Sequence, residues 1–396
     1  MFYKDKKVLN SICKYVLDGL PKDFGNPGLL TGNSGASLFC YEISRLTPSI
    51  EDSQAENNSR SLAKYYMQIA LDQLRFGDMS LASGITGVAF VLNYLSKTDL
   101  FEPEETDEIL EHLDSKIANS VSHDIEKKLY DYMYGYLGKG YYLRGREGFK
   151  QTIDQIDYAL KNSIESFDMP LWRDTLGEKY SADKPLFSFG LAHGISGILH
   201  FLIKSFKETE NKDSVKLIIE NAIKKVLEFE LSGMQSLFPD DHLVKRSSRL
   251  GWCRGDLGIA NIIYNAGEAL ENDEWKKMGL DIFLHCSKRT LDDSLIRIID
   301  GKIETGFCHG VAAPAHFFHS IYLRTGESQF LASHNYWKSV LLNHFNSEKI
   351  YLQFNNEEST WNRNSNLLQG DIGIALSLLE IYRQKSGVIS ELFMTD

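Results

Sequence analysis

Seven short glycine-containing segments recur along this chain of 396 residues, and they constrain the fold more than any other feature. The segments begin at Leu30, Ala82, Met133, Ala192, Cys253, Cys308 and Leu368, and each has glycine at its third position. Between these first glycines the steps are 52, 51, 59, 61, 55 and 60 residues. A period of this size indicates one supersecondary unit that is used repeatedly.

An apolar run with helical spacing follows most of these segments. Such runs begin at Val88, Ile198, Ile259 and Ile374, and they are apolar on nearly all sides, as in helices buried on most faces. The stretches between them are longer and charged, and residues 59–75 and 213–231 are clearly amphipathic. We therefore predict seven helical hairpins, each with a buried inner helix and a solvated outer helix. The glycines lie where the inner helix begins, where backbones approach closely or φ is positive.

The ends of the repeat decide between an open solenoid and a closed ring. Open solenoids carry polar capping repeats, but here the first and last modules are as apolar as the middle ones. The pattern therefore predicts an all-α fold, an α/α toroid of seven inner and seven outer helices. All glycine segments would lie at one end, which we call the mouth. No linker interrupts the repeat, so residues 1–396 are expected to form a single domain.

Little β-structure is expected. Residues 295–304 resemble a minor β-hairpin with a turn at Asp300-Gly301, just before Cys308 and hence near the mouth. Residues 235–249 and 348–361 are expected to be long connections at the same end, and connections of that length are usually functional or mobile.

Composition excludes several classes of protein. The formal charge of −11 argues against a nucleic-acid-binding protein, which would carry a basic patch or domain. No long apolar span is present, and residues 1–11 are mixed and lysine-rich, unlike an export signal. The expected location is the cytoplasm.

The five cysteines are odd in number and widely spaced, which is not a disulfide framework. Cys13, Cys40 and Cys286 lie within apolar helical patterns and are expected to be buried structural thiols. Cys253 and Cys308 differ, because each stands two residues before the first glycine of its module.

This shared register should place Cys253 and Cys308 on the same rim of the mouth, in neighbouring modules. His309 follows Cys308 directly. Two thiols and an imidazole favour Zn²⁺, and three protein ligands leave a fourth position for water or substrate, as in catalytic zinc sites. The alternative is a pair of unrelated core cysteines beside a hydrogen-bonded histidine.

Three further residues are candidates for the same site. His193 precedes Gly194 as His309 precedes Gly310, so it should face the mouth and could act as an acid or base, or only hold a loop. Asp131 could orient His193, hold a cation or cap a turn. Arg249 could neutralise charge on a substrate or pair with a surface carboxylate.

Together these motifs resemble a known family. The motifs are Trp252-Cys253-x-Gly255, Cys308-His309-Gly310, Ala192-His193-Gly194-Ile-Ser-Gly197 and Tyr130-Asp131-x-x-x-Gly135. They resemble the lanthionine cyclases, the LanC family of lantibiotic biosynthesis, and the resemblance extends over essentially the whole chain. The separation of the Trp-Cys-x-Gly and Cys-His-Gly motifs is the most specific part of it.

The resemblance implies a toroid with Zn²⁺ at its mouth, held by Cys253, Cys308 and His309. His193 and Asp131 would match non-ligand residues near the metal, and Arg249 the arginine before the Trp-Cys motif. The implied reaction is a Michael addition of cysteine thiols onto dehydroalanine or dehydrobutyrine in a dehydrated precursor peptide. It makes the lanthionine and methyllanthionine thioether rings of a lanthipeptide.

The same resemblance implies partners. A separate dehydratase would supply the dehydrated peptide, and a membrane transporter would export it, so the chain would be peripheral to a membrane-associated modification complex. One departure concerns the metal loop, where many relatives carry tyrosine and this chain has Arg254. That difference bears on substrate preference rather than on the metal ligands.

Three alternatives remain open. A LanC-like enzyme could add glutathione or another thiol to dehydroamino acids in proteins, with the same zinc chemistry. An α/α-barrel glycosidase needs two carboxylates across a cleft, and Asp256 and Asp371 share a register but are ordinary first-turn acids. A non-catalytic peptide-binding toroid is the third.

Overall fold

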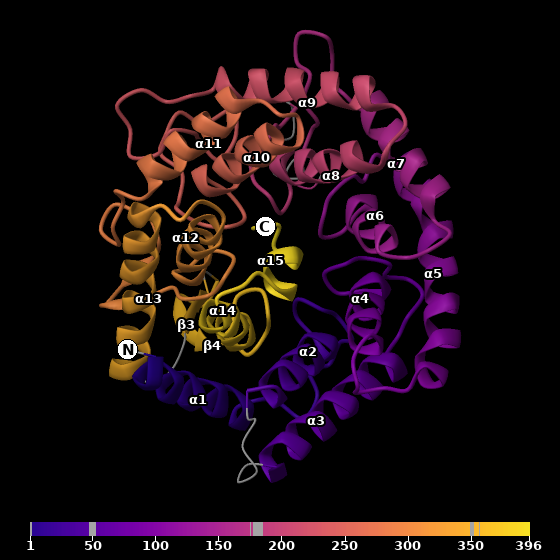
Figure 1. Cartoon of the computed structure of the whole chain (residues 1–396), viewed down its shortest axis with the longest axis vertical. Helices are drawn as coiled ribbons and strands as arrows, with labels where there is room; N and C mark the ends of the chain where they lie inside the picture. The colour runs from indigo at the N-terminus through magenta and orange to yellow at the C-terminus, as the bar shows by residue number, and fades with distance from the viewer. Residues whose placement is uncertain (1, 47–52, 175, 177–184, 349–351, 356) are drawn as a thin grey trace.

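The structure is a computed structural model, and it describes residues 2–46, 53–174, 176, 185–348, 352–355 and 357–396. Within these ranges it contains fifteen helices and two short β-hairpins. Seven helices form an inner ring and seven form an outer ring around it (Figure 1), so the predicted α/α toroid is confirmed.

The inner helices are α2 (Asn33–Ser44), α4 (Ile85–Ser96), α6 (Tyr136–Arg144), α8 (Ile195–Glu208), α10 (Asp256–Ala269), α12 (Ala312–Thr325) and α14 (Asp371–Arg383). The outer helices are α1 (Phe2–Asp18), α3 (Ser53–Asp72), α5 (Pro103–Glu126), α7 (Lys150–Asn162), α9 (Lys212–Leu227), α11 (Asp273–Cys286) and α13 (Ser328–Glu348). A short helix, α15 (Val388–Leu392), lies inside the ring. The inner helices are buried along most of their length, as their apolar sequences predict.

The two ends of the chain close the ring. Each inner helix from α2 to α12 packs against the outer helix that follows it, whereas α14 packs against α1. The inner helix α14 also contacts α2. At this seam Arg383 on α14 binds the carboxylate of Glu42 on α2, and its Nη2 donates to the Glu42 carbonyl at 2.9 Å. The first helix of the chain is therefore the outer partner of the last module.

The glycine repeat has a common structural cause. At all seven first glycines, an added Cβ would lie 1.9–2.5 Å from the carbonyl oxygen of the residue six positions earlier. In six modules the residue after the glycine donates its N–H to that same carbonyl, at 2.8–3.1 Å. The loop thus folds tightly over the helix start, and only glycine leaves room for it. Among these seven glycines, positive φ, the other expected reason, occurs only at Gly255, where φ is 101°.

A chain of main-chain hydrogen bonds joins the modules at the mouth. It involves the residues that stand two positions before the first glycine in six of the seven modules, Ala192 being the exception. The bonds are Leu30 N to Ala82 O (2.9 Å), Ala82 N to Met133 O (3.0 Å), Cys253 N to Cys308 O (3.4 Å), Cys308 N to Leu368 O (3.0 Å) and Leu368 N to Leu30 O (3.1 Å). The last of these joins module seven to module one. Residues of equal register therefore occupy equivalent places around the mouth.

The two hairpins lie in the loops that lead into α12 and α14. The predicted hairpin is present as β1 (Ile298–Ile299) and β2 (Lys302–Ile303), with a turn at Asp300 and Gly301, both at positive φ. A second hairpin, β3 (Leu352–Asn355) and β4 (Thr360–Arg363), overlaps the stretch 348–361 that we expected to be a long connection. Residues 349–351 and 356 of that stretch lie outside the described part.

The connection 235–249 has no helix or paired strand of its own, apart from one isolated bridge between Asp241 and Ser188. Asp256, at the start of α10, binds the backbone of this connection. The Asp256 carboxylate accepts hydrogen bonds from the backbone N–H groups of Leu237 and Phe238, each at 2.9 Å. Asp256 therefore anchors a loop, as expected of a first-turn acid rather than of a catalytic carboxylate.

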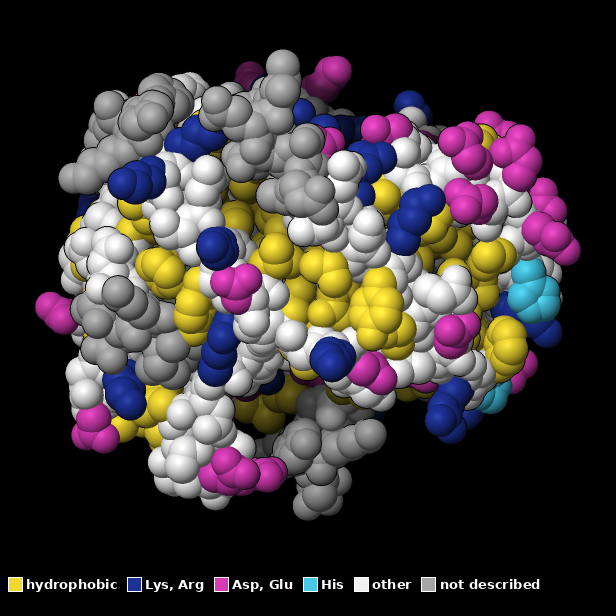
Figure 2. Space-filling view, turned by 90° about the horizontal axis from the view of Figure 1, so that it is seen from below, with side chains coloured by type: hydrophobic (Ala, Val, Ile, Leu, Met, Phe, Trp, Pro, Cys, Tyr) yellow, Lys and Arg dark blue, Asp and Glu magenta, His cyan; other side chains and the backbone are white. Residues whose placement is uncertain are grey.

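The outer surface is mixed in charge. On the side formed by α1 and α3, cationic and anionic side chains lie interspersed with apolar ones (Figure 2). None of the helices in the described ranges is long and apolar enough to cross a bilayer.

The close approach at the glycines gives a direct prediction. Replacing Gly84 by alanine would push a Cβ to 2.4 Å from the Asp78 carbonyl oxygen, which forces the backbone to move. We expect Gly84→Ala to lower the free energy of unfolding by about 3 kcal/mol, measured by urea denaturation. Gly77→Ala, in the same loop, meets nothing within 4 Å and should change stability little. Equal effects of the two substitutions would contradict this explanation of the repeat.

Two buried histidines predict a pH-dependent stability. His319 and His334 pack with ring centroids 5.1 Å apart, and burial lowers the pKa of His319 to about 3 and of His334 to about 4. Below pH ~6.5 these histidines become protonated in the unfolded chain but stay neutral in the folded chain. The free energy of unfolding therefore falls from pH 6.5 toward pH 4. In metal-free protein, His319→Leu should flatten this dependence in urea titrations. His123→Leu, at an exposed position on α5, should leave the slope unchanged.

Candidate metal centre

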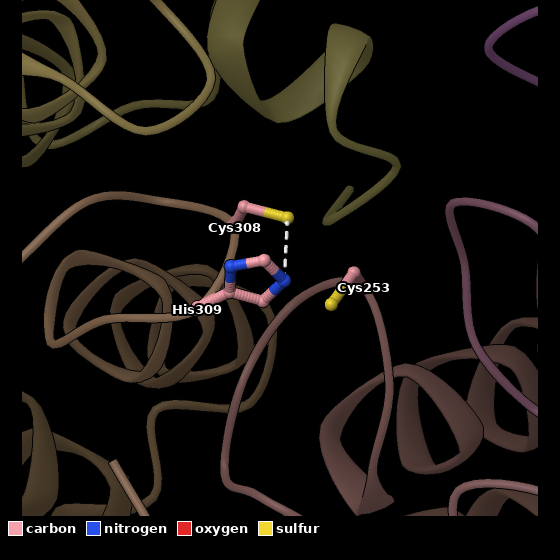
Figure 3. A group of neighbouring side chains, drawn as sticks. All are labelled: Cys253, Cys308 and His309. Atoms are coloured by element: carbon pink, nitrogen blue, oxygen red, sulfur yellow. Dashed lines mark hydrogen bonds between the residues drawn. The ribbon is translucent and has the colours of Figure 1, made fainter. Parts of the chain in front are cut away.

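Three side chains meet at one point on the mouth. Cys253 comes from the loop before α10, and Cys308 and His309 come from the loop before α12; all three point toward one another (Figure 3). Their ligand atoms lie within 4.8 Å of one another, and Cys308 Sγ is 3.4 Å from His309 Nε2. Tetrahedral Zn²⁺ with ordinary bond lengths would need ligand separations of about 3.5–3.8 Å. Within the described ranges, no other Cys, His, Asp or Glu joins this cluster.

The backbone holds the two cysteine loops together. Both Trp252 N and Cys253 N approach the Cys308 carbonyl oxygen, at 3.3 and 3.4 Å. The loop before α10 also differs from the other six, because Gly255 has φ of 101°. This is the one module in which the residue after the glycine makes no hydrogen bond of the common type. The irregular turn therefore occurs where Cys253 is presented.

The electrostatics of the cluster favour a thiolate. The neighbouring Cys308 thiol, and then the His309 imidazole, lower the pKa of Cys253 well below its usual range despite burial. Burial by itself lowers the pKa of His309, but the charge of Cys253 outweighs it, so the net pKa of His309 is raised. In a pair of thiolate and protonated imidazole, Zn²⁺ could take the place of the proton, since it binds cysteine only in its deprotonated form.

The other three cysteines behave differently, as expected. Cys13, Cys40 and Cys286 are buried in the apolar core. Burial raises the pKa of Cys13 to about 12, and it also raises the pKa of Cys40 and Cys286. These thiols stay protonated and are suited to packing rather than to metal binding.

His193 lies beside the cluster, and Asp131 orients it. His193 Nδ1 is 2.6 Å from Asp131 Oδ2, and Asp131 Oδ1 accepts a hydrogen bond from Tyr134 N at 2.7 Å. Burial alone would lower the pKa of His193, but the hydrogen bond and charge of Asp131 outweigh it and raise the pKa. The loop that carries His193 lies against the loop that carries Cys253, since an added Cβ at Gly190 would be 1.8 Å from the Cys253 carbonyl oxygen. The structure thus brings together the pair that the sequence suggested.

Arg249 and His309 both lie near the same carboxylate, that of Glu304. Its Nε donates to the Leu295 carbonyl at 3.1 Å, and its Nη1 is 3.9 Å from Glu304 Oε2. Glu304 is buried, and its Oε1 lies 3.9 Å from His309 Nδ1. Arg249 therefore pairs with a carboxylate, which was one of its two expected roles, but that carboxylate belongs to the site and not to the surface.

Sequence analysis missed three residues of this site. They are Glu304, Gln369, whose Nε2 is 3.4 Å from His309 Nδ1, and Tyr134, whose ring stacks on His193. Their positions relative to the first glycine of each module could have identified all three. Glu304 stands six residues before its glycine, as Arg249 does, and the other two directly precede theirs, as His193 and His309 do.

Asp256 and Asp371, which directly follow the first glycines of their modules, do not form a catalytic pair. Asp256 binds loop backbone, and the buried Asp371 accepts from Arg363 Nε at 2.6 Å. Burial raises the pKa of Asp371 to about 6, against the opposing charge of Arg363. Both groups are bound to partners inside the protein, which disfavours the glycosidase alternative.

Comparison with known proteins agrees with this architecture. Residues 23–394 match the family model described as lanthionine synthetase C-like protein. Among solved structures, a nisin cyclase superposes with a TM-score of 0.72 over 100% of this chain and 99% of that chain, at 20% sequence identity. At this identity the superposition establishes a shared fold.

The position of Glu304 gives a prediction about the metal centre. A buried carboxylate near the second nitrogen of a ligand histidine holds the ring in the ligating tautomer and raises its basicity. We expect Glu304→Gln to weaken Zn²⁺ binding about 10-fold or more, measured by competition with a chromophoric chelator. Glu358→Gln, at an exposed position before β4, is the matched control and should bind as wild type does. Unchanged affinity in Glu304→Gln would show that Glu304 plays no part in ligation.

Proposed function

Because the chain belongs to the lanthionine synthetase C-like family, we propose that it is a zinc-dependent cyclase that forms thioether rings in a peptide. Cysteine thiols of a dehydrated precursor peptide would add to dehydroalanine or dehydrobutyrine and give lanthionine or methyllanthionine. We also propose that residues 1–396 act as one domain, because α1 and α14 close the ring.

One observation carries this proposal. Two thiols and an imidazole converge within 4.8 Å at the mouth, next to a histidine that a buried aspartate orients. The first group has the donors of a three-ligand zinc site, and the second has the form of an acid–base pair. Thiol addition to an activated double bond needs these two functions, a means of deprotonating sulfur and a proton donor.

Cys253, Cys308 and His309 would hold the metal. Zn²⁺ bound there would supply Lewis acidity that lowers the pKa of a substrate thiol, which is otherwise ~8.5 and mostly protonated at neutral pH. Glu304 and Gln369 would keep the His309 ring oriented from its Nδ1 side. Arg249 would balance the charge of Glu304.

The addition conserves atoms and electrons. The substrate sulfur forms a bond to the β-carbon, the carbon–carbon π bond breaks, and the electron pair moves toward the carbonyl as an enolate. The α-carbon then takes up a proton, so the thiol proton is replaced and nothing leaves. We assign that proton delivery to His193, because its raised pKa favours the imidazolium form and Asp131 holds its Nδ1.

The proposal is tested with a synthetic peptide that carries one cysteine and one dehydroalanine. Wild-type protein should contain about one Zn²⁺ per chain and accelerate ring formation, while Cys308→Ala should lose both. His193→Asn should retain Zn²⁺ but slow cyclisation by about 10²–10⁴-fold, since general acid catalysis is typically of that size. His123→Asn, at an exposed position on the outer helix α5, is the matched control. Zinc is measured by elemental analysis and rings by mass spectrometry after thiol alkylation.

Three results would change the assignment. A folded wild type without Zn²⁺ and without rate acceleration would leave a peptide-binding toroid. Addition of glutathione in place of ring closure would favour a LanC-like enzyme that adds external thiols to dehydroamino acids. Full cyclisation by His193→Asn would remove His193 as the proton donor while leaving the metal site intact.

A further inference from the structure

Residues 388–396, which we call the plug segment, lie in the centre of the ring (Figure 1). The segment consists of α15 and the residues that follow it. Leu392, Phe393, Met394 and Thr395 are at most 1% exposed. At its start, the buried Glu380 on α14 accepts hydrogen bonds from the backbone N–H groups of Ile389 and Ser390. The glycine repeat does not account for this segment, and no step of the proposed reaction uses it.

The ring binds the plug segment by its backbone. Five consecutive main-chain carbonyls, from Leu392 to Asp396, each accept a hydrogen bond from a side chain of the ring. The donors are Tyr132 Oη to Leu392 O (2.6 Å), Trp252 Nε1 to Phe393 O (2.7 Å), Asn261 Nδ2 to Met394 O (2.9 Å), Ser320 Oγ to Thr395 O (2.5 Å) and Asn265 Nδ2 to Asp396 O (2.9 Å). Because buried carbonyls are costly to leave unpaired, these bonds fix the plug segment relative to the ring.

The contacts of Phe393 connect this segment to the metal centre. Its ring stacks on Phe307, with centroids 4.0 Å apart and planes 15° apart, and meets the edge of Trp252 at 4.9 Å. Phe307 immediately precedes Cys308, and Trp252 immediately precedes Cys253. The plug segment approaches both cysteine loops in Figure 3. All three rings are buried to 1% exposure or less.

We infer that Phe393 is a positioning residue for the metal centre: by packing against both Trp252 and Phe307 it sets the separation of the two cysteine loops. Next to the cysteines, the two loops also meet directly, through the edge contact of Trp252 with Phe307 at 6.4 Å and the bonds to the Cys308 carbonyl oxygen. Those bonds, at 3.3 and 3.4 Å, are long for hydrogen bonds. A close-packed aromatic cluster transmits small displacements, because protein interiors compress little. Loss of the Phe393 ring would leave a cavity under both ligand loops. This inference rests on the proposed metal site.

The test separates positioning from general stability. Phe393→Ala and Met394→Ala both remove buried side chains of the plug segment, but Met394 Cε lies on the side of α8, 3.8 Å from the position of an added Cβ at Gly197. Full-length proteins are compared for thermal stability without metal, for Zn²⁺ affinity by chelator competition, and for the Co²⁺ absorption spectrum. Phe393→Ala should bind Zn²⁺ about 10- to 100-fold more weakly and alter the Co²⁺ bands. Met394→Ala should match wild type in both. Phe393→Leu, which restores most of the volume, should recover most of the affinity.

Each other outcome has a distinct meaning. If both alanine variants bind Zn²⁺ as wild type does, Phe393 is only a core residue and the inference is wrong. If both lose affinity in proportion to their loss of stability, the effect is general, and the inference again fails. A wild type that binds no Zn²⁺ overturns the proposed metal site itself, and with it any positioning role.

Discussion

The structure depends on one repeated backbone contact at the mouth. In every module a glycine lies so close to the carbonyl six residues earlier that no side chain fits between them. The loops that these contacts shape are joined by main-chain hydrogen bonds from Leu30 to Ala82 and from Leu368 back to Leu30. Because backbone atoms make these bonds, the side chains at the same positions are free to differ. The ring is therefore a common frame on which individual modules carry different chemistry.

The candidate metal centre is built from side chains that differ between modules at these equivalent positions. Five modules have an apolar residue at the second position before the glycine, and two neighbouring modules have Cys253 and Cys308. The hydrogen bond from Cys253 N to Cys308 O belongs to the same series that joins the other loops. The next position faces the mouth and supplies His193, His309 and Gln369. Placing these groups in register brings a thiolate, an imidazole and an oriented histidine together without any insertion in the fold.

Buried polar groups support this site from several directions. Asp131 orients His193, Glu304 lies near His309, and Asp256 holds the loop that leads to Cys253. Each carboxylate is near a group that can donate to it or carry positive charge, which offsets the cost of its burial. The plug segment adds apolar support from inside the ring, where Phe393 packs against the residues that precede both cysteines. Loop backbone, carboxylates and aromatic packing together define where the ligands lie.

The sequence by itself determined the toroid and the convergence of Cys253, Cys308 and His309. It did so because a helical period and a repeated register are local patterns, and equal registers in a closed ring occupy equivalent places. It also predicted the β1–β2 hairpin from the Asp300-Gly301 turn. Only the tertiary structure decided the pairing of α1 with α14, the β3–β4 hairpin, the contacts of Glu304 and Gln369 with His309, and the position of the plug segment. Trp252 and Phe393 are 141 residues apart, and no local pattern relates them. Such contacts follow from how the ring closes on itself, which is a property of the whole chain.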